Sequence, residues 1–112
     1  MNSYSLTIIP ATDTDPELKI DTLDIKKTVI FLRAINHKLR QVILKYIGEK
    51  GKVTVTEIFD HLLLEQAVAS QHLAILRKAG FVKTKRDGKF IYYSVNRQRV
   101  MDLNKFVSDL LG

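Results

Sequence analysis

The sequence predicts a mainly α fold with a small β-hairpin, and two neighbouring stretches carry this prediction. Residues 66–80 have the apolar spacing of an amphipathic helix that ends at Gly80. Residues 81–95 place Asp87-Gly88 between two runs of strand-forming residues, which indicates a hairpin with a type I′ turn. With three helices predicted before this pair and one after it, the order is H-H-H-H-hairpin-H, a winged helix-turn-helix.

The N-terminal part is predicted to be an arm followed by a helix. Residues 1–14 are polar and lack periodicity, so we expect a flexible arm there, and a single domain over residues 15–112. Asp15-Pro16-Glu17 has the pattern of a helix start, with Asp as N-cap and Pro at the first helical position. This first helix is expected to end near Arg33.

Two shorter helices are predicted between the first helix and residues 66–80. Asn36 is expected to cap the earlier one, which runs to about Gly48. Thr54, with Glu57 three residues later, fits a capping box and opens the next short helix. A tight turn then leads into residues 66–80.

The last helix is predicted from Asn96 or a neighbour to Leu111. Four of its apolar residues stand at 3-4-3 spacing, a narrow seam of coiled-coil type. The seam could fold onto its own domain, but we favour dimerisation because the first helix also has more apolar surface than one neighbour would cover. The expected dimer interface comprises Leu18, Ile25, Val29, Val100, Leu103, Val107 and Leu110.

The outward face of residues 66–80 has a chemistry that is unusual for a solvated helix. It carries no carboxylate, its first turns hold small and amide side chains, and its last turn is cationic. Short side chains allow close approach to a surface, and Gln can bind adenine through two hydrogen bonds. We interpret it as a DNA recognition helix, with an ordinary solvated face as the alternative; the expected contacts are Gln66, Ala67, Ser70, Gln71, Arg77 and Lys78.

Positive charge is concentrated in the same part of the chain. The formal net charge is +6, and residues 77–99 hold eight Lys or Arg against the single Asp87. Such a concentration is typical of a surface that binds phosphate, although a basic solvated face would look the same. At the hairpin tip we expect Lys85, Arg86 and Lys89 to contact phosphates or the adjacent minor groove.

Composition excludes several classes of function. The 112 residues contain no cysteine, which excludes disulfides and thiolate metal sites. No apolar run approaches the roughly 20 residues of a membrane span, so we expect a cytoplasmic protein without a membrane partner. We find no paired nucleophile and base, no phosphate-cradling glycine loop and no paired carboxylates, so we expect neither an enzyme nor a cofactor.

The three histidines do not predict a metal site. His37 and His61 lack a second ligand at i+3 or i+4, the spacing that puts two ligands on one helix face. His72 falls on the inward face of residues 66–80. We expect it to be a packing and hydrogen-bonding residue.

Three segments resemble the ArsR/SmtB family of bacterial repressors: residues 34–44, residues 70–82 and residues 87–95. The S-x-H-L-x-x-L-R-x-A-G run from Ser70 and the G-K-x-x-Y-Y run from Gly88 carry the resemblance. It implies a homodimeric winged helix that binds an imperfect inverted repeat in DNA, with the first and last helices at the dimer interface. It also implies release from DNA by an effector.

The chain departs from that family where metals would bind. Residues 57–62 occupy the helix of the thiolate site and contain no cysteine, and Arg97, Gln98 and Arg99 begin the helix of the carboxylate–histidine site. We therefore expect an effector other than a metal, an unknown small molecule being one candidate. The alternatives are a protein-binding winged-helix adapter and a DNA-binding regulator without an inducer.

Overall fold

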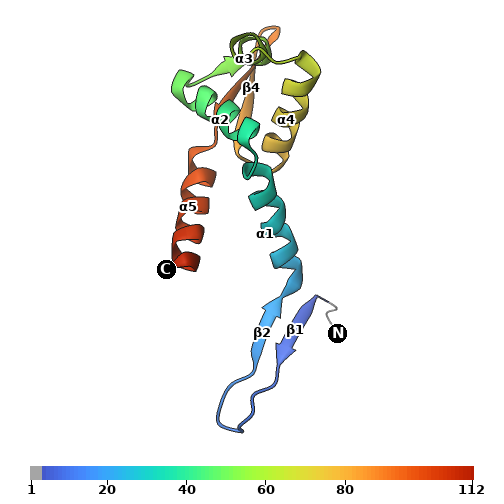
Figure 1. Cartoon of the computed structure of the whole chain (residues 1–112), viewed down its shortest axis with the longest axis vertical. Coiled ribbons are helices and arrows are strands. Elements are labelled where there is room, and N and C mark those ends of the chain that lie inside the picture. The colour runs from blue at the N-terminus through green and yellow to red at the C-terminus, as the bar shows by residue number, and fades with distance from the viewer. Residues whose placement is uncertain (1–3) are drawn as a thin grey trace. The chain divides into compact units, whose positions relative to one another are not determined.

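The structure is a computed structural model that describes residues 4–112 (Figure 1). The chain divides into two compact units, Met1–Arg33 and Ala34–Gly112. The single domain over residues 15–112 stays a prediction. The elements run in the order β1 (Ser5–Ile8), β2 (Leu18–Asp21), α1 (Thr22–Ile35), α2 (Lys38–Lys50), β3 (Val53–Thr54), α3 (Val55–Leu62), α4 (Gln66–Lys78), β4 (Val82–Asp87), β5 (Phe90–Val95) and α5 (Arg97–Leu111).

Strands β1 and β2 form a two-stranded antiparallel ribbon within the first unit. Ser5 lies opposite Asp21, and Ile8 lies opposite Leu18. Residues 5–8 are thus a paired strand, where the sequence predicts a flexible arm over residues 1–14; residues 1–3 of that arm lie outside the described residues. The partner strand starts ten residues after β1 ends, so no local pattern reveals the pairing.

Helix α1 begins at Thr22, and the helix start predicted at Asp15-Pro16-Glu17 is wrong. The cap is Asp21, whose Oδ1 accepts hydrogen bonds from the backbone N–H groups of Leu23 and Asp24 at 2.9 and 3.1 Å. The residues before it pair with β1, and this pairing overrides the local Asp-Pro signal. Leu18, predicted to lie in the first helix, is therefore a strand residue.

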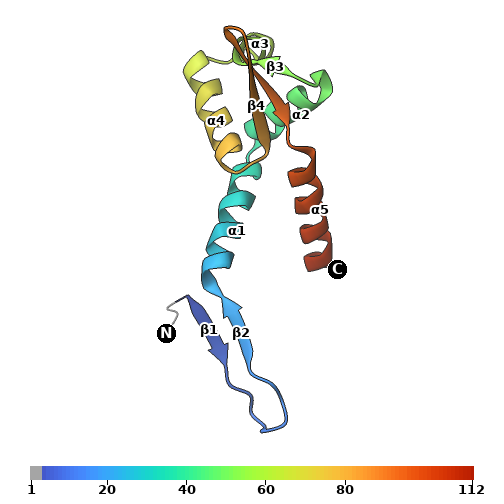
Figure 2. The ribbon, with the colours of Figure 1, turned by 180° about the vertical axis from the view of Figure 1, so that it is seen from behind.

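The core of the second unit lies between helices α2, α3 and α4 and the inner face of a three-stranded sheet. The sheet has the order β3-β5-β4, and the views in Figures 1 and 2 agree that the helices gather beside it. Every helix of this group contributes fully buried side chains, and so do the sheet and its approach. The largest are Phe81, Ile43, Ile47, Ile58, Leu73, Leu76 and Val53.

Helix α2 starts at Lys38, so the predicted Asn36 cap is wrong. The N-cap residue is His37, whose side chain makes no capping hydrogen bond. Two α2 side chains instead reach back to the end of α1: Arg40 Nε donates to the Ala34 carbonyl at 2.6 Å, and Gln41 Nε2 donates to the Ile35 carbonyl at 3.0 Å. These bonds serve carbonyls that a helix end leaves without intrahelical partners.

The cap predicted for the third helix is confirmed. Thr54 Oγ1 accepts from the backbone N–H of Glu57 at 3.3 Å and donates to the Glu57 carboxylate at 3.3 Å. The sequence does not predict strand β3, in which Val53 lies opposite Tyr93 and Thr54 lies opposite Tyr92 of β5. A two-residue strand leaves too short a pattern to read.

Helix α5 begins after Asn96, as predicted, because Asn96 Oδ1 accepts from the backbone N–H of Arg99 at 3.3 Å. Figures 1 and 2 show α5 extending away from helices α2, α3 and α4. None of its residues is fully buried. Among residues 4–112, no helix is long and apolar enough to cross a membrane.

Candidate nucleic-acid interface

A short left-handed turn delivers helix α4. Leu63, the C-cap residue of α3, has φ 55 and ψ 45, and its N–H bonds to the Phe59 carbonyl. The N–H of Leu64 bonds to the same carbonyl at 2.9 Å. Glu65 then occupies the N-cap of α4 without a side-chain capping bond, so Gln66 opens the helix. Helices α3 and α4 with this turn form the helix-turn-helix.

Helix α4 divides into the two predicted faces. Ala69, Leu73 and Leu76 are completely buried against the core. The six residues predicted to contact DNA are all exposed, and within residues 4–112 none of their side chains forms a hydrogen bond or ion pair. These residues are Gln66, Ala67, Ser70, Gln71, Arg77 and Lys78. Their polar groups are therefore available to a partner.

The end of α4 is fixed by Gly80, as predicted. Gly80 has φ 83, its N–H bonds to the Arg77 carbonyl, and the N–H of Phe81 bonds to the Leu76 carbonyl, both at 2.9 Å. This pair of bonds is the Schellman motif, which needs a left-handed residue. Asn96 extends the junction, because its Nδ2 donates to the Gly80 carbonyl and its backbone N–H donates to the Phe81 carbonyl, both at 2.8 Å.

The wing is formed by β4 and β5, and its turn differs from the prediction. Asp87 pairs with Phe90, so the two central residues are Gly88 and Lys89 rather than Asp87 and Gly88. Only Gly88 has positive φ, at 63. This matches a type II′ turn with Gly at the first central position, and not the predicted type I′ turn.

The three wing cations are exposed, but they do not share one face. Lys85 lies opposite Tyr92 and Arg86 lies opposite Ile91, and adjacent strand residues project to opposite faces. Lys89 is in the turn, with its Nζ 5.4 Å from the centre of the Phe90 ring. The wing therefore presents cations on both sides and at its tip.

Behind α4, His72 has the packing role predicted for it. Its Nδ1 lies 3.2 Å from Arg40 Nη1, and its ring centre lies 4.9 Å from that of His37. Burial, the neighbouring His37 and the Arg40 guanidinium together lower the pKa of His72 below its usual value of 6.5. The sequence gives no signal that His37 and Arg40 would meet His72, because they come from an earlier helix.

The residues predicted for the dimer interface belong to both units. Leu18, Ile25 and Val29 lie in the first unit, and the first two are 59% and 49% exposed. Of the α5 seam, Leu110 is 71% exposed, and Val100, Leu103 and Val107 are half-buried.

In the described part of the chain, no group of three or more His, Asp or Glu could hold a metal ion.

Comparison with known proteins identifies the family. The profile described as "Bacterial regulatory protein, arsR family" matches residues 37–84. An uncharacterized HTH-type transcriptional regulator of Methanocaldococcus jannaschii is 35% identical over 85 residues, which make up 76% of this chain and 96% of that protein. This chain belongs to the arsR family.

Two further relatives show what this arsR-family protein resembles. The crystal structure of the transcriptional repressor PagR of Bacillus anthracis matches with a TM-score of 0.62 and 29% identity, over 76% of this chain and 97% of PagR. The transcriptional activator HlyU of Vibrio cholerae is 32% identical over 74 residues, 66% of this chain and 68% of HlyU. The arsR-family protein is therefore a winged-helix, DNA-binding transcriptional regulator and not an enzyme.

Sequence reasoning missed two further cations of this arsR-family protein. Lys50 is the last residue of α2 and Lys52 lies on the loop that follows, and both border the outer face of the wing sheet. Their position near the wing becomes apparent only once strand β3 is paired with β5, since more than 30 residues separate them from Lys85 in the chain.

Proposed function

We propose that the protein is a homodimeric repressor that binds an imperfect inverted repeat and responds to an effector other than a metal. One observation carries the DNA-reading part of this proposal: apart from Ile75, the exposed residues of α4 are small, amide or cationic, and none is a carboxylate. PagR is named a repressor and HlyU an activator. We favour repression because a dimer seated on an inverted repeat blocks the promoter that contains it.

Within this proposal, the first turns of α4 read bases and its last turn binds phosphate. Ser70 and Gln71 contact base edges, with Gln66 or Ala67 beside them, because short and amide side chains suit the major groove. Arg77 and Lys78 are placed for phosphates or for support of those contacts. The wing cations Lys85, Arg86 and Lys89 bind phosphates or enter the adjacent minor groove, which fixes the register without reading sequence.

The proposed dimer follows from the number of contacts that one α4 helix provides. One recognition helix offers few base contacts, whereas a two-fold dimer places two of them in successive major grooves about 34–36 Å apart. The α5 seam is supported as part of the interface because its half-buried residues lie on a helix with no fully buried side chain.

Operator selection and a salt titration test the DNA proposal together. Duplexes selected from a random pool should contain two related half-sites in inverted orientation. The affinities for the selected duplex and for a random duplex should both fall steeply with salt. The slope of log affinity against log salt concentration should be about −0.9 for each phosphate contact. Neutralising Lys85, Arg86 and Lys89 together should weaken both affinities about equally and flatten both slopes.

Two results would contradict the proposal. A salt-independent affinity, or binding confined to a protein partner, would favour the winged-helix adapter instead. A loss confined to the selected operator in the triple wing variant would show that the hairpin reads sequence.

Fluorescence anisotropy with labelled operator tests the proposed effector class. With one equivalent of zinc, cobalt, nickel, cadmium or arsenite per protomer, we expect operator affinity within about threefold of the value with chelator, a coupling below roughly 0.7 kcal/mol. The physical reason is that an ion without a converging ligand set cannot distinguish free from DNA-bound protein. A tenfold loss would reveal a metal site assembled across the dimer, with His37 and His61 as the first residues to substitute.

A further inference from the structure

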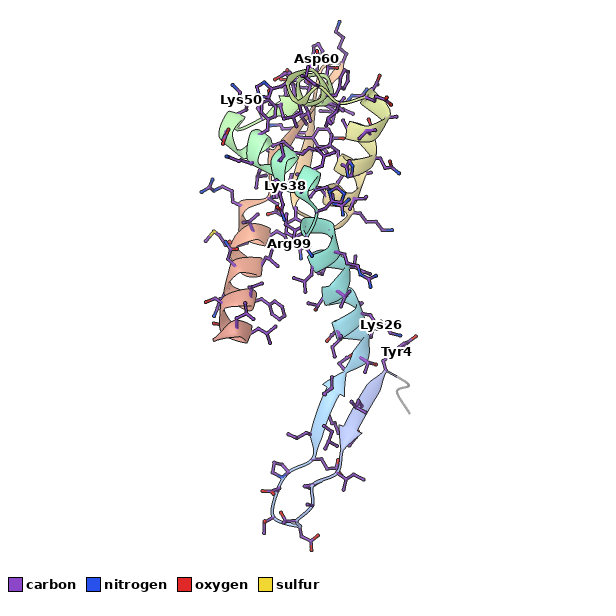
Figure 3. All side chains as sticks on the ribbon, in the orientation of Figure 1. Tyr4, Lys26, Lys38, Lys50, Asp60 and Arg99 are labelled. Carbon is purple, nitrogen blue, oxygen red and sulfur yellow. The ribbon has the colours of Figure 1, made fainter. Side chains whose placement is uncertain are left out.

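A cavity of about 400 Å³ lies beside the wing, between the loop that joins α2 to β3 and the outer face of the sheet. Its walls come from the end of α2 with the loop after it and from the two strands of the wing, which follow about 30 residues later in the chain. Lys50 and Lys52 flank Gly51 on the loop side, β4 provides Lys85 and Asp87, and β5 provides Tyr92 and Ser94. In Figure 3, Lys50 is labelled at the end of α2 that faces this loop.

The register of the sheet explains why the strand residues share one side. Lys85 lies opposite Tyr92, and alternate residues along each strand project to the same face, so Asp87 and Ser94 lie on that face too. The other face carries the buried Val82 and faces the core. The cavity therefore opens away from the core, where a ligand can enter without unfolding the unit.

The charges in this cavity leave an excess of two cations. Lys50, Lys52 and Lys85 face the single carboxylate Asp87, and within residues 4–112 none of the three lysines forms a salt bridge. Lys52 Nζ lies 5.1 Å from the centre of the Tyr92 ring, a cation–π distance that holds the ammonium group at the cavity. Among the lining residues, Ser94 adds a neutral hydroxyl donor.

We propose that this cavity binds a phosphate group. Three lysine ammonium groups and a hydroxyl supply the charge and the hydrogen-bond donors that a phosphate dianion needs, and the one nearby carboxylate leaves the balance positive. The phosphate has two chemical sources: the backbone of DNA beyond the wing, or a free phosphate-bearing small molecule. The proposal rests on the proposed function in one respect, because Lys85 belongs both to the cavity and to the DNA contacts of the wing.

The two sources have opposite effects on DNA binding. A backbone phosphate held by Lys50 and Lys52 lengthens the interface and adds to the release of counterions. A free phosphate compound at the same place occupies Lys85 and competes with DNA for it. The cavity is then either an extension of the operator contact or a site through which an anion weakens that contact.

The test compares a cavity variant with a matched control of equal charge change. The cavity variant is Lys50→Gln with Lys52→Gln. The control is Lys45→Gln with Lys105→Gln, two exposed lysines outside the cavity that each form an i,i+4 ion pair. All four side chains are on the surface, so both proteins should fold, and thermal melting checks this.

In the first arm, inorganic phosphate is titrated against chloride at fixed ionic strength while backbone amide NMR signals are recorded. If free phosphate is the ligand, the signals of residues 50–52, 85, 92 and 94 should shift saturably in the wild type and the control. In the cavity variant this response should weaken about fivefold or more. Phosphate should also lower the DNA affinity of the wild type more than chloride does.

In the second arm, the salt slope is measured on a duplex that extends a full turn beyond the wing. If the backbone is the ligand, the cavity variant should lower the slope by about one to two relative to the control. The proposal is overturned if phosphate gives no saturable shift and the two variants have equal slopes. Wild-type DNA binding would remain intact in that case, so failure here is distinct from failure of the proposed function.

Discussion

At the scale of single residues, two left-handed glycines fix loop geometry in the second unit. Gly80 has φ 83 at the end of α4, and Gly51 has φ 87 at the end of α2. A Cβ on Gly80 would lie 2.9 Å from Arg99 Nε, whereas a Cβ on Gly51 would meet nothing within 4 Å. Arg99 approaches through the flexible end of its side chain, so the backbone angle is the main cost at both positions.

We expect Gly80→Ala to lower the free energy of unfolding by about 1–2 kcal/mol, the cost of left-handed backbone for an L-residue. Gly51→Ala should lower it by about 1–3 kcal/mol, because φ 87 with ψ −60 is a backbone conformation that L-residues rarely adopt. Urea denaturation measures both losses, with the unfolding free energies of wild type and variants extrapolated using one common m value. A much larger loss for Gly80→Ala would show that Arg99 cannot move aside. No loss in either variant would contradict the left-handed geometry.

Also at the residue scale, Gln71→Ala should relax the preference at one operator position. The side chain is exposed on α4 without an internal partner, and a good bidentate contact to a base contributes about 1–3 kcal/mol of discrimination. Affinities for operators with each base at each position measure it. Gln98→Ala is the control, because it removes the same side chain from α5. Unchanged discrimination at every position would refute the proposed docking.

At the scale of elements, local signals place three helix ends correctly but misplace the starts of α1 and α2. The Thr54 cap, the Gly80 stop and the Asn96 start depend on a few neighbouring residues, and all three are confirmed. The predicted start of α1 is wrong because pairing with β1 draws Leu18–Asp21 into a strand. Strand β3 is not predictable because it has only two residues and because its partner β5 lies about 40 residues further on.

The candidate site shows the same division. The exposed face of α4 follows from helical periodicity alone, so all six of its predicted residues are exposed. The turn of the wing lies one residue later than predicted, because the pairing of Asp87 with Phe90 sets its position. Neither the cavity beside the wing nor the contact of His72 with Arg40 could be predicted, since each joins segments that only the tertiary structure brings together.

The packing of α2 against α4 makes stability depend on pH. Burial, His37 and Arg40 lower the pKa of His72 in the folded protein, while the unfolded chain keeps the ordinary value of 6.5. As the pH falls below about 6.5, the unfolded chain gains a proton before the folded protein does, so the free energy of unfolding decreases. Above that pH both forms are neutral at this position and the effect vanishes.

Melting temperatures recorded from about pH 8 to about pH 5.5 should therefore fall less in His72→Gln than in the wild type. His61→Gln is the control, because His61 stacks on Tyr46, with 4.3 Å between ring centres, and has no contact with this cluster. If all three proteins lose the same amount on acidification, His72 does not carry the pH dependence.

At the scale of the whole molecule, the assembly proposed above depends on α5. Leu103→Glu should separate the dimer, because a charge would be buried in an apolar seam. Operator affinity should then fall by about a thousandfold or more, toward the nonspecific level. Sedimentation and anisotropy on the same samples measure both, and Met101→Glu, on the other side of α5, is the control. If the Leu103→Glu variant remains a dimer, the interface is formed by α1 and not by the α5 seam.

The junction at Asn96 gives α5 a further consequence in the proposed dimer. Because Asn96 bonds to the Gly80 and Phe81 carbonyls, the end of α4 and the start of α5 are held together. In a dimer formed through α5, the position of α5 then sets the distance between the two α4 helices and therefore the length of the spacer between half-sites. One inserted base pair would rotate a half-site by about 34–36° around the duplex, since a turn takes 10–10.5 base pairs. Two α4 helices that are held through α5 cannot both follow that rotation, so such an operator should bind more weakly.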